Sequence, residues 1–262
     1  MITIYGWFGY NLPMKERYRL IKQAGFNGTI IWWEGSYCSD FRLQPDMARS
    51  EGLFVENIHA PYEGITNLWV DNLSGETAAE RLIGCVEDCY THEIPAVIVH
   101  PTSGNAPPPN DIGLDRIKRI VDRAKQKVVN VAFENLLRIE FLQYIFEHID
   151  SDRLGFCYDS GHHHSKTPDW DLLAVFGSRL MALHLHDNDG YISGAKEEDQ
   201  HRMPFDGTIN WTAIMRKISE TGYNGAVALE VVNGGYENLS AKDFLNIAFE
   251  SAKRLEELRC RV

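Results

Sequence analysis

Short apolar runs alternate about eight times with segments of helical periodicity, and this alternation restricts the fold more than any other feature. Polar residues do not alternate with apolar ones along these runs, which is typical of strands buried on both faces. Buried strands separated by helices form a parallel sheet with the helices outside it. We expect strands near residues 2–7, 28–33, 54–59, 96–100, 129–134, 154–159, 180–186 and 226–232.

Eight strand–helix units favour closure into an α/β fold of the (β/α)8 type, a TIM barrel of parallel strands with outer helices. An open nucleotide-binding sheet is the alternative, but the segment after the first strand, IYGWFGYNLP, lacks the pattern GxGxxG. The 262 residues agree with one barrel domain over 1–262, since such barrels have about 250 residues. Helices are expected at Met14–Ala24, Glu76–Thr91, Gly113–Lys127, Glu140–His148, Asp169–Phe176, Thr212–Thr221 and Ala241–Leu258.

The loops that follow the strands differ from those that precede them. Pro101–Asp111, Gly161–Pro168 and Asp187–Gly207 are long and rich in polar residues, whereas QAGFNG and ETGYNG are short and end a helix with glycine. Barrel active sites are built from the loops after the strands. We therefore expect the functional site at the carboxyl ends of the strands.

Acidic and histidine side chains end most of the expected strands. They lie in the segments NIHAPY, VIVHPT, VAFENL, CYDSGH, ALHLHD, EDQHR and ALEVV. A barrel gathers these ends at one mouth, and carboxylates with imidazoles bind Mn²⁺, Zn²⁺, Co²⁺ or Mg²⁺. The primary metal ligands are predicted to be Glu134, Asp159, His184 and Glu230. A structural ion pair of the glutamates with an arginine is the competing interpretation.

Five further residues are candidate ligands. These are His59, His100, His162, Asp199 and His201. His59 and His100 each precede a proline, and each alternatively binds substrate or supports a ligand. His162, three residues after Asp159, can turn back to the same pocket, whereas Asp199 has the alternative of a solvated acidic loop. His184 and His186 share one strand face, with His186 nearer the loop.

Composition restricts the partners and the compartment. The net charge of -11 disfavours nucleic acid without excluding it, and no apolar stretch is long enough to cross a membrane. The five cysteines lack a disulfide spacing, and the first residues lack a signal-peptide pattern. We expect reduced thiols and a cytoplasmic protein.

From HAPY to ALEVV the segments resemble the superfamily of xylose-isomerase-like barrels. This superfamily contains sugar and sugar-phosphate isomerases and epimerases, and also endonuclease IV (AP endonuclease family 2), which cleaves at apurinic/apyrimidinic sites. The resemblance to its epimerases implies one divalent ion on Glu134, Asp159, His184 and Glu230. It also implies that both glutamates move the proton and that His162 contacts the substrate. PFDGTINW is similar to a stretch frequent in uncharacterised isomerase-like members.

The resemblance to endonuclease IV implies up to three Zn²⁺ ions. All nine positions that match its ligands are chemically compatible, namely the four primary ligands together with His59, His100, His162, Asp199 and His201. The sequence departs in one respect from the epimerases and in another from endonuclease IV. The first arginine after His184 is Arg202, farther along the chain than in the epimerases. The mouth also holds few cations to grip phosphates, only Arg138, Lys166, Lys196 and Arg202.

The preferred hypothesis is a divalent-metal-dependent isomerase or epimerase of a small sugar, sugar phosphate or polyol. It would act by proton transfer through a metal-stabilised enediolate, with Glu134 and Glu230 as base and acid. The expected substrate-binding residues are His162, His186, Arg202, Trp7 and Tyr62, in a mouth that also carries Trp32, Trp33 and Trp69. An endonuclease IV-like phosphodiesterase is the alternative, followed by a non-catalytic sugar or metal sensor. The superfamily also allows a homo-oligomer.

Overall fold

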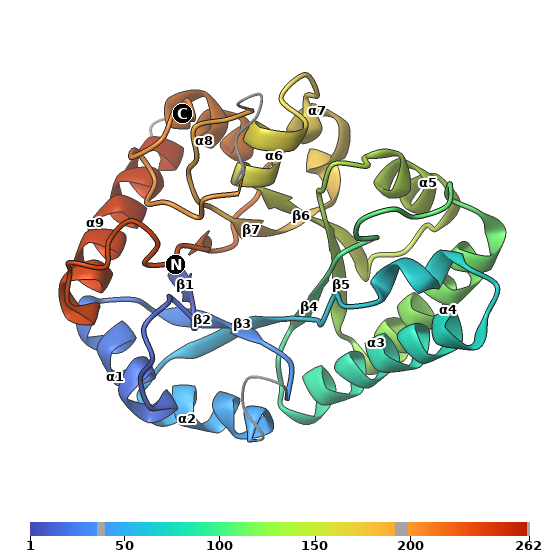
Figure 1. Ribbon diagram of the computed structural model, residues 1–262, viewed down its shortest axis with the longest axis horizontal. Coiled ribbons are helices and arrows are strands. Elements are labelled where there is room, and N and C mark those ends of the chain that lie inside the picture. Colours follow the sequence, from blue (N-terminus) through green and yellow to red (C-terminus); the bar gives the residue numbers. More distant parts are fainter. Residues whose placement is uncertain (36–39, 192–198, 261–262) are drawn as a thin grey trace.

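The chain folds into eight parallel strands that curve into a nearly closed barrel, as shown in Figure 1. The computed structural model describes residues 1–35, 40–191 and 199–260. The strands follow the order β7-β6-β5-β4-β3-β2-β1-β8, so that each pairs with its neighbour in sequence and β1 pairs with β8. Their bounds are β1 (Ile2–Tyr5), β2 (Gly28–Trp32), β3 (Phe54–His59), β4 (Ala96–Val99), β5 (Asn130–Glu134), β6 (Leu154–Asp159), β7 (Leu180–His184) and β8 (Val227–Leu229).

The remaining seam of the barrel, between β7 and β8, is closed by residues just beyond β7. The Leu185 N–H donates to the carbonyl of Ala228 at 2.9 Å, and the Glu230 N–H donates to the carbonyl of Leu185 at 3.1 Å. Closure therefore brings the first and last strand ends to the same mouth. The expected (β/α)8 barrel is confirmed.

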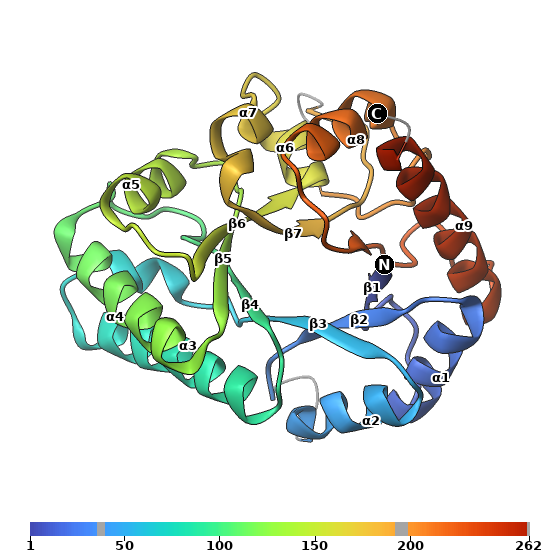
Figure 2. The same ribbon diagram turned by 180° about the vertical axis from the view of Figure 1, so that it is seen from behind.

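The helices surround the strands in both views (Figures 1 and 2). They are α1 (Met14–Ala24), α2 (Gln44–Ser50), α3 (Leu73–Thr91), α4 (Asp111–Lys127), α5 (Glu140–His148), α6 (Ser160–Lys166), α7 (Leu172–Phe176), α8 (Trp211–Glu220) and α9 (Ala241–Cys260). Short 3₁₀ turns are η1 (Phe41–Leu43), η2 (Ile65–Trp69) and η3 (Gly177–Arg179). None of the described helices is long and apolar enough to cross a membrane.

All seven expected helices are present, with some ends shifted by a few residues. Gly25, at φ 112°, caps α1 in the left-handed conformation, as the QAGFNG pattern predicts. The expectation of a loop over Gly161–Pro168 is wrong in its first part, because α6 begins directly after β6. The Asp159 carboxylate accepts a hydrogen bond from the His162 N–H at 2.6 Å, and this N-cap starts the helix despite its run of histidines.

Two other expectations need correction. Helix α2 was not foreseen, because its seven residues are too few for a clear amphipathic period. Strands β1, β7 and β8 end earlier than expected. At the mouth the chain leaves the sheet ladder for loop contacts, such as the bond from the Val232 N–H to the carbonyl of His201 at 3.1 Å. The apolar pattern continues past these points because the rim is still buried.

The register of the strands sets which side chains meet at the mouth. Asp159 pairs with His184, Glu134 with Cys157, and His59 with Trp32. Below this level, a small apolar cluster of Ile98, Ala132, Cys157 and Ala182 fills the barrel. The polar residues thus lie on a packed apolar floor, as is usual for barrels of this type.

Helices α3 and α4 pack side by side on the outside and enclose Trp69 from η2. Trp69 is buried, and its indole N–H donates to the carbonyl of Pro101 at 2.7 Å. A Cβ atom added at Gly113 of α4 would overlap the Trp69 ring. Glycine at this position therefore allows the helix to approach the indole.

We expect Gly113→Ala to lower the free energy of unfolding by about 1–3 kcal/mol, because the added methyl overpacks this contact. Gly84→Ala in α3 is the matched control, since no atom lies within 4 Å of a Cβ added there. Removing that glycine should instead stabilise the helix by about 0.5–1 kcal/mol. Urea titrations of both variants would measure the difference. Equal stabilities would show that Trp69 can move aside.

Candidate metal centre

The carboxylate of Glu134 is the centre of the cluster at the barrel mouth. It ends β5, and its side chain is only 1% exposed. Four imidazoles surround it. Oε2 lies 3.2 Å from His59 Nε2, 3.3 Å from His100 Nε2 and 3.4 Å from His184 Nδ1, and Oε1 lies 3.0 Å from His162 Nδ1. A single acid thus links side chains from four other elements.

Among the groups of potential ligands that share Glu134, two contain only carboxylates and imidazoles. One consists of His59, His100 and Glu134, and the other consists of Glu134, Asp159, His184 and Glu230. In each group the donor atoms lie within 4.8 Å of one another. The structure therefore brings the four predicted primary ligands together, with Glu134 positioned to bridge to a second group.

His184 provides an independent test of whether a metal fits. Its ring is fully buried, yet neither ring nitrogen forms an aligned hydrogen bond, although Nδ1 lies 3.1 Å from Glu230 Oε2. Buried polar atoms without partners are rare and usually indicate an additional ligand. Donor atoms that face each other around a common point fit a divalent cation of the imidazole- and carboxylate-binding class.

A third group lies beside the first two. It consists of His186, Asp199 and His201, with Asp199 Oδ1 3.7 Å from His186 Nε2 and 3.5 Å from His201 Nε2. The rings of His186 and His201 stack at a centroid distance of 4.0 Å. The sequence predicted His162 here in place of His186. His162 instead lies between the groups, with Nε2 2.7 Å from Asp199 Oδ2 and Nδ1 near Glu134.

Burial and the neighbouring charges have opposite effects on the pKa values in the cluster. Burial by itself would raise the pKa of Glu134, but His184 and His100 hold that pKa well below its ordinary value. His184 also outweighs the burial of Glu230 and lowers its pKa. Conversely, Asp199 raises the pKa of His201 to about 9 against the effect of burial. In the absence of metal, the raised pKa values of His162, His184 and His201 favour protons on these rings, which offset part of the carboxylate charge.

Two residues outside the predicted set position the ligands. Asn135 Oδ1 accepts from the Asp159 N–H at 2.8 Å, and its Nδ2 donates to the Asp159 carbonyl at 2.9 Å, so that the end of β6 is fixed beside β5. Asp187 is fully buried and accepts from the Trp211 indole N–H at 2.7 Å and from the Phe205 N–H at 3.0 Å. Asp187 therefore ties the loop that carries Asp199 and His201 to the PFDGTINW segment.

The only sequence signal for Asn135 is its place directly after Glu134. Asp187 ends the segment ALHLHD, where its position suggests that it orients substrate or ligands, and the structure shows that it anchors the loop. At Gly207 of PFDGTINW, a Cβ atom would overlap the Asp187 carboxylate. Gly207 leaves room for the Asp187 carboxylate, and Trp211 donates a hydrogen bond to it. The PFDGTINW motif therefore anchors the loop.

A cavity of about 580 Å³ opens above the cluster. His59, His100, Glu134, His162, Asp199, His201 and Glu230 line it, together with Tyr5, Trp32, Tyr62, Arg138 and Lys166. Tyr62 stacks on His100 with centroids 4.7 Å apart. This volume lies within the range of about 300–1,000 Å³ typical of small-molecule sites.

The other predicted substrate contacts lie elsewhere. His186 is fully buried below the cavity, where Nε2 lies 3.1 Å from Asp159 Oδ2. Arg202 does not line the cavity, and its guanidinium pairs with Asp189 at 2.7 Å. Trp7 lines a neighbouring cavity. Trp33 and Trp69 are buried in the core, and Lys196 lies outside the described residues.

Three curated relatives share parts of this sequence. The uncharacterized protein y4fM of Sinorhizobium fredii is 35% identical over 57% of this chain and 45% of its own length. The "Inosose isomerase" of Halalkalibacterium halodurans is 29% identical over 40% of this chain and 37% of its own. The "Probable endonuclease 4" of Mycoplasma genitalium is 27% identical over 68% of this chain and 65% of its own. The matched segments thus span less than two thirds of each relative.

Solved structures share the fold over almost the whole chain. A D-tagatose 3-epimerase-like protein superposes with a TM-score of 0.74 at 19% identity and covers 98% of this chain and 97% of its own. The IOLI protein, solved with a binding zinc atom, gives a TM-score of 0.77 at 17% identity and covers 97% and 98%. The family model described as "Xylose isomerase-like TIM barrel" matches residues 18–257. The chain belongs to this family of xylose isomerase-like TIM barrels.

Proposed function

We propose that this protein is a divalent-metal-dependent isomerase or epimerase of a small carbohydrate. The observation that carries the proposal is the convergence of two carboxylates on one ring nitrogen, since Glu134 at the end of β5 and Glu230 just after β8 both lie near His184 Nδ1. This convergence lies below a cavity of small-molecule size. Two carboxylates at one ligand site are what a reaction that removes and returns a proton requires.

Glu134, Asp159, His184 and Glu230 would hold the ion. Neither ring nitrogen of the buried His184 forms an aligned hydrogen bond, and the described ion-pair partners of Glu134 are histidines instead of a lysine or arginine. Both observations support a metal over a buried ion pair. When bound, a divalent cation neutralises negative charge that develops on neighbouring substrate oxygens. Mn²⁺, Zn²⁺, Co²⁺ and Mg²⁺ all accept this set of donors.

The chain's own groups would move the proton. The lowered pKa values of Glu134 and Glu230 keep both carboxylates ionised at neutral pH, so that each can accept a proton from a substrate C–H bond. Glu230, with a side chain that is 12% exposed against 1% for Glu134, is the more open of the two to the cavity. His162 also lines the cavity, where its two ring nitrogens contact Glu134 and Asp199, so that it would contact a substrate oxygen in exchange for one of these partners.

The class of substrate is supported by the relatives. One curated relative is named an inosose isomerase, and one structural neighbour is a D-tagatose 3-epimerase-like protein. Both names refer to activity on polyhydroxylated carbonyl compounds. The stacked pair of Tyr62 and His100 beside the cavity offers a flat apolar surface for such a ring.

Replacement of either glutamate tests the proton transfer. With the Mn²⁺-loaded protein, we expect Glu134→Gln and Glu230→Gln each to slow exchange of substrate C–H protons with D₂O about 10²–10⁴-fold. Proton NMR on a panel of ketohexoses and inososes would measure the exchange. Glu147→Gln, at an exposed position on α5, is the control and should exchange at the natural rate. Full exchange in both active-site variants would reject the assignment.

Metal binding should release protons, because ligands must be deprotonated and His201 holds a proton below its pKa of about 9. The affinity for Zn²⁺ should therefore rise with pH up to about 9 and change little above it. Calorimetric titration in two buffers of different ionisation enthalpy would count the protons. His201→Asn should release fewer. Proton-independent binding from neutral pH upward would contradict the charge balance described above.

A hydrolase of the endonuclease IV type is the second candidate. It is favoured by the two ligand groups that share Glu134, by the adjoining group of His186, Asp199 and His201, and by the endonuclease-named relative. The net charge of -11 and the pairing of Lys166 with Asp199 at 3.4 Å argue against a surface that grips several phosphates. The sugar-directed activity is therefore preferred.

Incubation of the Zn²⁺-loaded protein with a duplex that contains one abasic site separates the two candidates. We expect no strand cleavage at enzyme excess, because the described cavity lining offers only Arg138 and Lys166 as cations for the backbone. The same duplex treated with alkali provides the positive control. Metal-dependent nicking would make the hydrolase the better description.

A further inference from the structure

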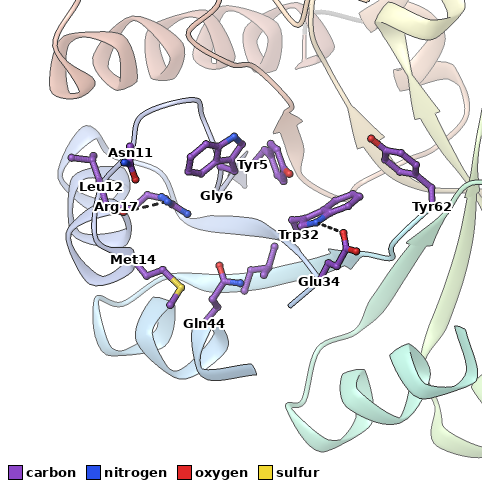
Figure 3. Close-up of a pocket in the computed structure, with 12 residues that line it drawn as sticks. Tyr5, Gly6, Asn11, Leu12, Met14, Arg17, Trp32, Glu34, Gln44 and Tyr62 are labelled. Atoms are coloured by element: carbon purple, nitrogen blue, oxygen red, sulfur yellow. Dashed lines mark hydrogen bonds between the residues drawn. The ribbon is translucent and has the colours of Figure 1, made fainter. Parts of the chain in front are cut away.

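A second cavity of about 330 Å³, whose lining Figure 3 shows, shares three lining residues with the cavity above the candidate metal centre. It lies between the loop after β1, helix α1 and the end of β2. Trp7, Asn11, Arg17, Glu34 and Gln44 line it, and Tyr5, Trp32 and Tyr62 border both cavities. Each cavity alone reaches the lower end of the range of about 300–1,000 Å³ for ligand sites. One monosaccharide therefore leaves the second cavity unused.

The shared aromatic side chains connect the second cavity to the metal centre. The Trp32 ring stacks on His59 with centroids 5.1 Å apart and meets Tyr62 edge-on at 5.3 Å. Tyr62 in turn stacks on His100. A ligand group that packs against Trp32 would thus be separated by one side chain from each of His59 and His100. Because Tyr5, Trp32 and Tyr62 border both cavities, one molecule with two linked units can occupy both.

Trp7 offers the second cavity a fixed apolar surface. Its side chain is 38% exposed, so that part of the indole is open to a ligand. The Arg17 guanidinium lies 4.7 Å from the Trp7 ring centroid and supports the indole from one side. Trp7 and Trp32 both line this cavity. Flat indole faces of this kind can stack on the apolar C–H face of a sugar ring.

Polar groups around the indoles complete the site. Gln44 Oε1 accepts a hydrogen bond from the Tyr18 hydroxyl at 2.8 Å, which fixes the amide and leaves its NH₂ group as the donor for a ligand. Glu34 accepts from the Trp32 indole N–H at 3.2 Å and adds an acceptor. The lining carries one arginine and one glutamate, so that their charges balance. This balance favours a neutral hydroxyl-bearing ring over a phosphate.

We infer that the substrate is a glycoside of at least two sugar units. The reacting unit lies over the metal centre, and a neutral second sugar ring stacks in the cavity between Trp7 and Trp32. The identity of the reacting unit rests on the function proposed above. The second subsite rests on the cavity and its lining alone.

Calorimetric binding to the Mn²⁺-loaded protein tests the inference with matched sugars. The probes are D-glucose against maltose and cellobiose, and D-fructose against turanose and lactulose. We expect at least one disaccharide to bind ten-fold or more tightly than its monosaccharide, a gain of about 1.4 kcal/mol. Trp7→Ala should reduce this ratio to near one, and Trp7→Phe should keep part of it. Melting temperatures would check that both variants are folded.

Trp170→Ala is the matched control, because Trp170 is 40% exposed and lines neither cavity. It should keep the natural ratio. Equal affinities for mono- and disaccharides, no binding of any disaccharide, or a ratio unaffected by Trp7→Ala would overturn the inference.

A parallel D₂O exchange assay on the same sugars separates the two proposals. Exchange on D-fructose without a disaccharide preference would leave the isomerase standing and reject the subsite. A Trp7-dependent disaccharide preference without any exchange would support the second subsite and reject the isomerase.

Discussion

The site depends on one buried carboxylate. Glu134 ends an otherwise apolar strand and has imidazoles from β3, the β4 end, α6 and β7 around it. A buried acid of this kind is costly unless several positive or donor groups compensate it. The four surrounding imidazoles provide that compensation. The histidines therefore have two tasks, since they stabilise the acid in the free protein and offer nitrogen donors to a cation.

The barrel supplies the precision that such a cluster needs. Parallel register sets Asp159 beside His184, and the side chain of Asn135 joins the ends of β5 and β6. The long loop after β7 is less constrained by the sheet, so that its anchors are side chains instead. Asp187 binds Trp211 and the backbone of Phe205 and thereby holds the segment that carries Asp199 and His201. His201 itself has a left-handed backbone at φ 44°, a strained conformation that such anchoring can maintain.

The two adjoining cavities would separate the reacting unit of the substrate from the unit that is only recognised. The cavity above the metal centre is lined by the acids and histidines that would act on a sugar, while its neighbour holds indoles and fixed amide and carboxylate groups. Separation of reaction and recognition along one face of the barrel is consistent with sites built from different loops after the strands. The low cation content of the cavity lining distinguishes this arrangement from a phosphate-binding groove.

The sequence by itself determined the barrel and the meeting of Glu134, Asp159, His184 and Glu230 at its mouth. Strand–helix alternation and strand-end acids are local patterns, and a parallel barrel leaves one place for strand ends to meet. Tertiary structure alone decided that His186 joins Asp199 and His201, that Arg202 turns to Asp189, and that Trp7 borders a separate cavity. These outcomes depend on how loops of different length fold over the mouth. The contacts that fix them, such as Asp187 with Trp211, join residues far apart in the chain, so no local pattern contains them.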